Sequence, residues 1–312
     1  MVVFSHPLLV LVSSFAVVIA QPSILQDISH LESSHSNLLQ YPTQLTQNIV
    51  PKAIHSHNDY WRDVPLLTAV SLGVASVEAD VWLFNGQLFI GHEPAALITQ
   101  RTFDSLYIQP LLSMLDQQNP KTVFTQAANL STPNGVFDTS SGTPLQLLVD
   151  IKTDGEAAMP FVLRALEPLR SKGYLTTFDN GVLKPSAVTV VGTGNTPLDA
   201  VLALAPRDYF FDAPLTGLGT NPANATWSPN IAPIASTDYQ VAVGWDGIND
   251  ITDTQKQTIN NLISTAHGLG IKARFWDTPG WPIFAREKIW QQLVDSGADW
   301  LNADDLEAAS KF

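Results

Sequence analysis

Short apolar, β-rich runs alternate with longer helical patterns along the chain from Lys52 onward. Such alternation is typical of βαβ units and a parallel sheet. The candidate strands are Lys52–Ser56, Ser76–Leu83, Leu147–Lys152, Ala187–Val191, Tyr209–Asp212, Val241–Trp245, Ile271–Trp276 and Asp299–Asn302. Eight strands in this order predict an α/β fold, a TIM-type (β/α)8 barrel in a single domain over residues 51–312, rather than an open doubly wound sheet. Since no glycine-rich turn follows the first strand, a dinucleotide fold is disfavoured.

Helical patterns fill most of the segments between these strands. They cover Pro65–Leu72, Ser105–Gln118, Glu156–Leu169, Leu198–Leu204, Asp253–Leu269 and Pro282–Asp295. The crossover between Tyr209 and Val241 is rich in proline and asparagine and is only weakly helical. Asn85-Gly86 predicts a tight β-hairpin after the second strand.

The N-terminal residues have the pattern of a targeting signal followed by a polar arm. Leu8–Ala20 is an apolar run that is too short to span a bilayer and ends in small residues suited to cleavage. We predict a signal peptide over residues 1–20, a polar arm over residues 21–50 and a secreted protein, with an uncleaved anchor as the alternative. Sequons at Asn129 and Asn224 predict N-linked glycans.

The acidic charge of the chain restricts its partners. Its 312 residues carry a formal net charge of −13, which repels polyanions and makes a nucleic-acid partner or a polybasic mode of membrane binding unfavourable. We expect a small substrate and at most a transient contact with a membrane surface, and we infer no protein partner. Cysteine is absent, so the chain has no disulfide and no cysteine nucleophile or metal ligand.

Paired carboxylates interrupt the second candidate strand. Glu78 and Asp80 are two residues apart, so their side chains project from the same face, where burying them uncompensated is costly. Asp150, in the third strand, would supply a third carboxylate. Such hard oxygen ligands favour a divalent cation, Mg²⁺ or Ca²⁺, over zinc. Lys152 would neutralise a phosphate or hold a carboxylate, while a solvated acidic face is the alternative explanation for the pair.

Histidines gather beside these carboxylates. His55 and His57 close the first strand, and His92 follows the hairpin. Free imidazole titrates near pH ~6.5, which suits an acid/base pair. Asn58 is a candidate for substrate contact. So is Trp276, two residues after Arg274 on the same strand face, although packing inside the barrel explains Trp276 equally well.

The stretch from His55 to Glu93 resembles the superfamily of phospholipase-C-like phosphodiesterases, which includes glycerophosphodiester phosphodiesterases and sphingomyelinase D-type lipases. The shared pattern is a histidine ending strand one, Glu-x-Asp in strand two, a hairpin, a second histidine, and an acid-x-Lys in strand three. Within the superfamily, the segments HSHNDY and SVEADVWL, with KARFWD and GADWLNADD near the C-terminus, are most similar to the fungal altered inheritance of mitochondria protein 6 family.

This resemblance implies a phosphoric diester hydrolase with two catalytic histidines and a cation site, acting on a lipid-derived phosphodiester. The cation ligands it implies are Glu78, Asp80 and Asp150. In its chemistry a neighbouring hydroxyl of the substrate often attacks, which yields a cyclic phosphate.

The first catalytic histidine of the family maps to either His55 or His57. The strand end and Asn58 favour His55, whereas the spacing to Glu78 favours His57, and we predict His55 with His92 as its partner. Glycerophosphodiesterases carry His-Arg-Gly at this point, where this chain has His55-Ser56-His57.

Two other functions fit parts of the pattern. A catalytically silent barrel could bind a lipid or a sugar, but it would not need the complete set of acid/base and metal positions. A secreted glycoside hydrolase would use two carboxylates, usually from later strands, and would not need the histidines.

Overall fold

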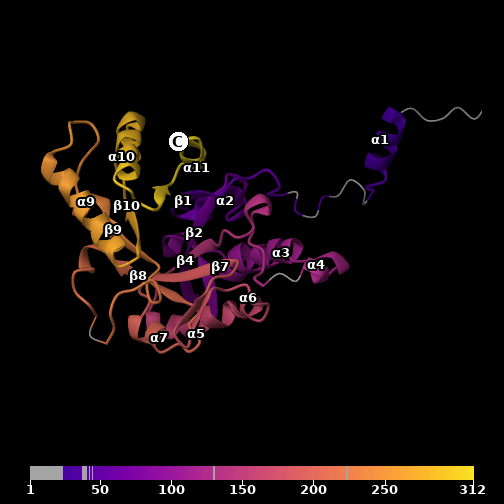
Figure 1. Cartoon of the computed structure of the whole chain (residues 1–312), viewed down its shortest axis with the longest axis horizontal. Coiled ribbons are helices and arrows are strands. Elements are labelled where there is room, and N and C mark those ends of the chain that lie inside the picture. Colours follow the sequence, from indigo (N-terminus) through magenta and orange to yellow (C-terminus); the bar gives the residue numbers. More distant parts are fainter. Residues whose placement is uncertain (1–23, 37–40, 42, 44, 129–130, 223) are drawn as a thin grey trace, which may run out of the picture. The chain divides into compact units, whose positions relative to one another are not determined.

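The computed structural model describes residues 24–36, 41, 43, 45–128, 131–222 and 224–312 (Figure 1). The chain divides after Pro42 into two compact units. The first contains helix α1 (Ile24–Ser33), which buries no residue. The predicted signal peptide, residues 1–20, and the sequon residue Asn129 lie outside the described residues.

A barrel of parallel strands forms the second unit. In spatial order its strands are β1 (Lys52–Ser56), β2 (Val74–Phe84), β4 (Leu145–Ile151), β7 (Val188–Gly194), β8 (Phe210–Pro214), β9 (Ile234–Asp238), β10 (Lys272–Trp276) and β11 (Leu301–Ala303). From β1 to β10 neighbours in this list are hydrogen-bonded, and β11 pairs with β1. A parallel bridge between Arg274 and Trp300 joins β10 to the segment leading into β11. The predicted TIM-type α/β barrel is therefore confirmed.

Helices and short turns connect the strands. The helices are α2 (Leu67–Ser71), α3 (Gln109–Gln118), α4 (Val123–Ala128), α5 (Gly155–Ala165), α6 (Glu167–Arg170), α7 (Leu198–Leu202), α8 (Tyr239–Ala242), α9 (Asp253–Gly268), α10 (Ile283–Asp295) and α11 (Leu306–Lys311). Single turns are η2 (Asp59–Trp61), η3 (Pro94–Ala96), η4 (Asp104–Ile108), η5 (Asp138–Ser140) and η6 (Leu215–Gly217). Among the described residues no helix is long and apolar enough to cross a membrane.

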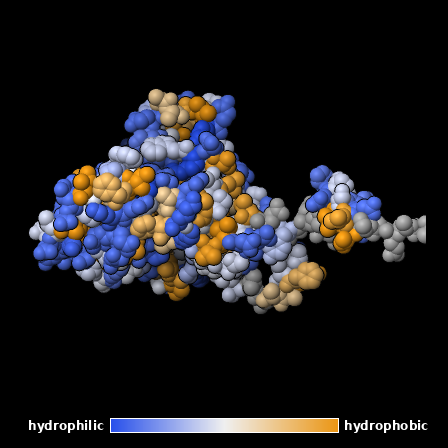
Figure 2. All heavy atoms as spheres, turned by 90° about the horizontal axis from the view of Figure 1, so that it is seen from above, coloured by the Kyte–Doolittle hydropathy of each residue, from blue (hydrophilic) through white to orange (hydrophobic). Residues whose placement is uncertain are grey.

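Capping side chains set where the larger helices begin. Thr252 and Gln255 form a reciprocal capping box at the start of α9, and the Asp154 side chain accepts a hydrogen bond from the amide of Ala157 in α5. Helix α5 packs against β2 and β4, and α9 packs against β10. Residues of β2 and β4 are buried on both faces over most of their length. Hydrophobic residues on the face in Figure 2 form several separate patches with hydrophilic residues between them.

Two antiparallel hairpins are added to the parallel barrel. One joins β2 to β3 (Gln87–Ile90) through Asn85 and Gly86, both with positive φ, as the Asn-Gly pair predicts. The other joins β5 (Thr177–Asp179) to β6 (Val182–Lys184) and was not predicted. The first hairpin matters for the site because β3 leads directly into His92.

One predicted strand is wrong. Val241–Trp245 is not a strand: the sixth barrel strand is β9, and helix α8 follows it at once. The Asp238 carboxylate accepts a hydrogen bond of 2.9 Å from the amide of Val241, and this cap starts the helix. Val241 is 85% exposed, so its apolar character does not indicate a buried strand here. The other predicted strands each overlap an observed one.

Candidate active site

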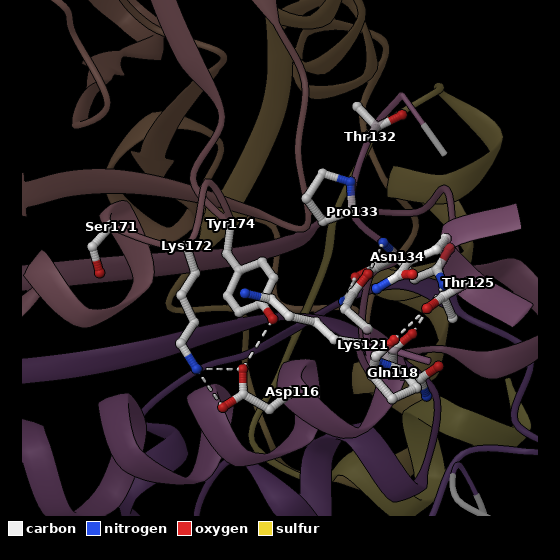
Figure 3. Close-up of a pocket in the computed structure, with 13 residues that line it drawn as sticks. Asp116, Gln118, Lys121, Thr125, Thr132, Pro133, Asn134, Ser171, Lys172 and Tyr174 are labelled. Carbon is white, nitrogen blue, oxygen red and sulfur yellow. Dashed lines mark hydrogen bonds and ion pairs between the residues drawn. The ribbon is translucent and has the colours of Figure 1, made fainter. Parts of the chain in front are cut away.

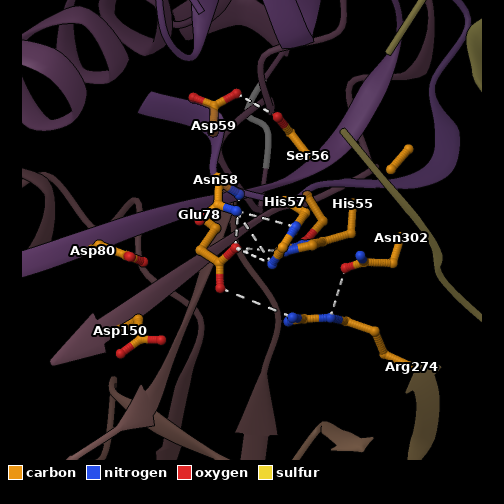
Figure 4. Close-up of polar contacts among 12 residues, drawn as sticks. His55, Ser56, His57, Asn58, Asp59, Glu78, Asp80, Asp150, Arg274 and Asn302 are labelled. Atoms are coloured by element: carbon orange, nitrogen blue, oxygen red, sulfur yellow. Dashed lines mark hydrogen bonds and ion pairs between the residues drawn. The ribbon is translucent and has the colours of Figure 1, made fainter. Parts of the chain in front are cut away.

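Three carboxylates converge where β2 and β4 end. Asp80 pairs in register with Asp150, and Glu78 lies two residues earlier on β2. Oxygen atoms from all three lie within 4.8 Å of one another. Figure 4 shows Asp80 and Asp150 beside each other, with Glu78 turned toward the histidines of β1. The carboxyl ends of the strands are also where TIM barrels carry their active sites.

The carboxylate cluster suits a divalent cation. Asp80 Oδ1 and Asp150 Oδ1 are buried and have no hydrogen-bond partner among the described residues. Gly194, at a φ of 62°, leaves room for Asp150, because a Cβ there would lie 2.0 Å from Asp150 Oδ1. Buried, unpartnered carboxylate oxygens cost free energy unless a ligand meets them, and hard oxygens suit Mg²⁺ or Ca²⁺.

Lys152 partly offsets the charge of this cluster. Its Nζ lies 3.0 Å from Asp80 Oδ2 and 2.9 Å from Asp150 Oδ2. Burial, together with the charges of Glu78 and Asp150, nevertheless raises the pKa of Asp80 to about 7. Burial alone would lower the pKa of Lys152, but the two aspartates outweigh it and raise that pKa to about 12. One ammonium group is thus too little positive charge for three carboxylates.

Glu78 is the most connected residue of the site. Its Oε2 accepts a hydrogen bond of 2.9 Å from the amide of Asn58, and its Oε1 lies 3.9 Å from Arg274 NH2. Burial would raise the pKa of Glu78, but the ring of His55 and the charge of Arg274 hold it well below its usual range. Asn58 adopts a φ of 48°, which is accessible to asparagine and aims its amide at the carboxylate. Glu78 is therefore ionised and fixed in place.

His57 is held by a carboxylate from the segment after the last strand. Its Nδ1 lies 2.9 Å from Asp304 Oδ1, and its Nε2 lies 4.0 Å from Glu78 Oε2. Burial would lower the pKa of His57, but the hydrogen bond to Asp304 and the charge of Glu78 outweigh it and raise the pKa. The side chain is 21% exposed, so a substrate can reach it.

His55 has different surroundings. Its side chain is fully buried, its Nδ1 lies 2.7 Å from Ser76 Oγ, and its Nε2 lies 3.7 Å from Glu78 Oε2. Burial and the charge of Arg274 lower the pKa of His55 to about 3, so the ring is neutral. The buried His55 therefore lies beside Glu78 on the inner side of the site and supports the Glu78 carboxylate.

Tyr60 links His92 to the carboxylates. Its hydroxyl donates to Asp80 Oδ2 at 2.6 Å and lies 3.1 Å from Nδ1 of His92. The Asn58 side chain also contacts this hydroxyl. Since the hydroxyl has only one proton, Nδ1 of His92 is the donor in their contact, which leaves Nε2 free to accept a proton. His92 is half-exposed, and Trp61 packs edge-on against its ring at 5.7 Å.

A buried aspartate braces the loop that carries these groups. Asp59 accepts hydrogen bonds from the Ser56 hydroxyl at 2.6 Å, the Leu66 amide at 2.7 Å and the Tyr107 hydroxyl at 3.1 Å. Tyr107 also contacts the backbone carbonyl of Glu78 at 2.9 Å. The loop after β1 is therefore tied to β2, which fixes the histidines relative to the carboxylates.

The structure brings together most of the residues singled out in the sequence. The histidines, the three carboxylates, Lys152 and Asn58 form one connected cluster, whereas Trp276 ends β10 at 36% exposure. Sequence reasoning missed Tyr60 and Asp304 as parts of the site. Both lie within the motifs that carry the family resemblance, but no spacing rule connects them to the histidines.

A separate pocket of about 860 Å³ lies away from this cluster (Figure 3). Its lining includes the C-terminal end of α3 and the segment before β7, so it opens toward the amino ends of the strands. There Lys172 pairs with Asp116 at 2.6 Å, and Tyr174 contacts the same carboxylate. These charged groups already have partners, and the cluster of carboxylates and histidines lies at the other end of the barrel.

Known proteins are similar to this chain over most of its length. A family model described as the AIM6-like phosphodiesterase domain matches residues 43–212. A protein of Arthroderma benhamiae named altered inheritance of mitochondria protein 6 homolog is 44% identical over 313 residues, covering 97% of this chain and 96% of that protein. The Eremothecium gossypii protein named altered inheritance of mitochondria protein 6 is 36% identical, and the match covers 86% of this chain and 72% of that protein. The Saccharomyces cerevisiae S288c protein of the same name is 33% identical, and the match covers 86% of this chain and 73% of that protein. The matched residues include the three histidines, Glu78, Asp80 and Asp150, whereas Asp304 and Arg274 lie beyond them.

Proposed function

Because this chain belongs to the altered inheritance of mitochondria protein 6 family, with its AIM6-like phosphodiesterase domain, we propose that it is a metal-dependent phosphoric diester hydrolase. One observation carries the proposal. Buried carboxylates with unpartnered oxygens on Asp80 and Asp150 form one cluster with Glu78, and two accessible histidines adjoin it, His57 beside Glu78 and His92 beside Asp80. A glycoside hydrolase has no use for this combination.

The cation ligands are Glu78, Asp80 and Asp150. A divalent cation bound there would offset negative charge on a phosphate oxygen. Lys152 contacts two of these carboxylates, and its ammonium group is partly exposed, so it adds a second positive charge for the phosphate. Arg274 approaches Glu78 from β10 and keeps that carboxylate charged.

The hydrogen bonds of the two histidines suggest their roles. Asp304 accepts from Nδ1 of His57 and stabilises the charged ring, so His57 can donate a proton from Nε2 to the leaving oxygen. His92 directs Nδ1 toward Tyr60 and presents Nε2 as an acceptor for the proton of the attacking hydroxyl. We therefore assign the acid/base role on β1 to His57 rather than to the fully buried His55.

The substrate we propose is a small phosphodiester derived from a lipid. Attack by a neighbouring hydroxyl of the substrate would release a cyclic phosphate, and attack by water would release a phosphomonoester. We also propose secretion, with a glycan on Asn224. Asn224 lies in a turn and both it and Thr226 are exposed, so a glycosyltransferase can reach the sequon.

A metal-dependence experiment tests the proposed activity. Purified protein is incubated with glycerophosphodiesters, lysophospholipids and sphingomyelin in Mg²⁺, Ca²⁺ or EDTA, and products are followed by phosphorus NMR. We expect turnover of at least one diester that EDTA abolishes and added cation restores. The Glu78→Gln variant, kept in Mg²⁺, is the control for contaminating enzymes. Turnover that persists in EDTA contradicts the metal assignment, and absence of turnover on every diester favours a silent binding barrel.

A further inference from the structure

A row of buried polar side chains crosses three neighbouring strands next to Glu78, on the side of the amino ends of the strands. His55 on β1 is in register with Ser76 on β2, and Ser76 is in register with Gln146 on β4. All three residues are buried. Buried polar side chains need hydrogen-bond partners, and these three supply partners to one another. The roles assigned above to the cation, His57 and His92 use neither Ser76 nor Gln146.

Short polar contacts connect this row to Glu78. Gln146 Nε2 donates a hydrogen bond of 2.8 Å to Ser76 Oγ, and Ser76 Oγ lies 2.7 Å from His55 Nδ1. On the opposite side of the ring, His55 Nε2 lies 3.7 Å from Glu78 Oε2, just beyond ordinary hydrogen-bond length. Figure 4 shows the His55 ring beside the Glu78 carboxylate. The amide, the hydroxyl and the imidazole therefore form a chain that ends at a proposed cation ligand.

The direction of these hydrogen bonds follows from the protons available. A serine hydroxyl has one proton, and Ser76 Oγ already accepts from the Gln146 amide, so its own proton is available to His55 Nδ1. Nδ1 then accepts, and the single proton of the neutral ring lies on Nε2, which faces Glu78. With the proton on Nδ1 instead, the Nε2 lone pair would face the Glu78 carboxylate, and two buried acceptors would oppose each other at a cost. Both ends of the chain thus select the same tautomer.

The Nε2 proton of His55 completes the surroundings of Glu78. The amide of Asn58 donates to Glu78 Oε2 at 2.9 Å, and Arg274 NH2 lies 3.9 Å from Oε1. An Nε2 proton adds a third positive group from β1, so the carboxylate is met from three different segments of the chain. Groups that contact a metal ligand from behind orient it, and losing one typically costs about 10–100-fold in metal affinity or activity.

We propose that Ser76 and Gln146 are positioning residues, which keep the proton of His55 on Nε2 and thereby orient Glu78 for the cation. This inference rests on the proposed function for the presence of a cation at Glu78. Both residues act through His55 rather than through contact with the substrate. The two histidines of β1 thus have separate tasks: His57 exchanges a proton with the substrate, whereas His55 keeps its proton on the nitrogen that faces a cation ligand.

The tautomer of His55 is measured directly in the metal-free protein, without requiring turnover. Long-range proton–nitrogen NMR spectra of isotope-labelled protein at neutral pH show which ring nitrogen carries the proton, and the signals that disappear in His55→Asn belong to His55. We expect the proton on Nε2 in the wild-type protein and a measurable fraction of the other tautomer in Ser76→Ala and Gln146→Leu. A wild-type ring with its proton on Nδ1, or with protons on both nitrogens, overturns the proposal. So does an unchanged tautomer in both variants.

Calorimetric titration with Mg²⁺ tests whether this chain matters for the cation. Ser76→Ala and Gln146→Leu should each weaken Mg²⁺ binding about 10-fold or more. Two matched variants are the controls. Ser186→Ala and Gln118→Leu remove a buried hydroxyl and a buried amide that make hydrogen bonds elsewhere in the protein, and they should keep the wild-type affinity.

The outcomes separate the chain of hydrogen bonds from the proposed function. Wild-type Mg²⁺ affinity in both Ser76→Ala and Gln146→Leu overturns the proposal. An equal loss of affinity in the two controls also overturns it, because the loss of any buried polar contact would then suffice. If the tautomer depends on Ser76 as expected but the wild-type protein binds neither Mg²⁺ nor Ca²⁺, the proposed function is refuted and the role of Ser76 and Gln146 in setting the tautomer stands.

Discussion

The two halves of the barrel hold different charges. Around β1, β2 and β4, in what we call the carboxylate half, Glu78, Asp80 and Asp150 lie close together beside His55 and His57. In the other half, Arg274 on β10 approaches Glu78 with a positive charge, and an exposed turn between β8 and β9 carries Asn224. Catalytic groups must be held still before substrate arrives. We therefore expect substitutions in the carboxylate half to change the rate far more than substitutions on the outer surface of the other half.

Removing charge from the carboxylate half should have the largest effect on the rate. Glu78→Gln and Asp80→Asn each preserve side-chain shape but remove a cation ligand. We therefore expect kcat to fall about 10³-fold or more, where each factor of ten corresponds to about 1.36 kcal/mol of activation free energy. Far-UV circular dichroism should remain that of the wild-type protein. Near wild-type turnover by either variant in Mg²⁺ would show that the cation site is wrongly placed.

Substitution of the accessible histidines should cause the second largest loss of rate. His57→Asn and His92→Asn should each cost roughly 10²–10⁴-fold in rate, the usual contribution of a general acid or base. A diester with an activated leaving group needs no acid, so it should rescue His57→Asn and not His92→Asn. The comparison is made by measuring kcat on activated and ordinary diesters. The same rescue in His55→Asn, with His57→Asn unaffected, would return the acid role to His55.

The buried His55 makes the stability of the carboxylate half depend measurably on pH. Its folded pKa of about 3 lies below the ordinary value of 6.5, so the unfolded chain binds the proton more readily and stability is lost as pH falls below about 6.5. Between pH 7 and pH 5 the wild-type protein should lose about 2 kcal/mol more unfolding free energy than His55→Asn. Urea unfolding at both pH values measures this difference, and parallel losses in the two proteins would argue against a neutral, buried ring.

The outer surface of the second half should be the least sensitive. Asn224 lies in an exposed turn between β8 and β9, so Asn224→Gln should change unfolding free energy by less than about 0.5 kcal/mol and leave kcat unchanged. Protein secreted from a eukaryotic host should lose mass on treatment with a glycosidase, and the loss should be smaller in the variant. An identical mass loss in both proteins would mean that Asn224 carries no glycan.

Local patterns predicted the first half of the barrel better than the second. Glu78 and Asp80 share a face because a strand alternates, and the Asn85-Gly86 turn delivers His92 back beside Asp80. On β9 the same reasoning failed, because Ile234–Asp238 contains few strand-forming side chains and the following apolar run looked more like a strand. There the Asp238 cap outweighed the β-propensity of Val241 and its neighbours.

The sequence by itself determined the β/α alternation, the carboxylates that share a face on β2, and the histidines next to them. These follow from backbone periodicity and short-range turns, which act between residues close along the chain. Only the closed barrel decided that Asp304 from the segment after β11 holds His57, and that Arg274 from β10 reaches Glu78. The closed barrel also determines that His55 is buried while His57 is accessible, although both are histidines and their spacing predicts side chains on the same face. Long-range register and packing set those pairings, and no local rule on spacing contains them.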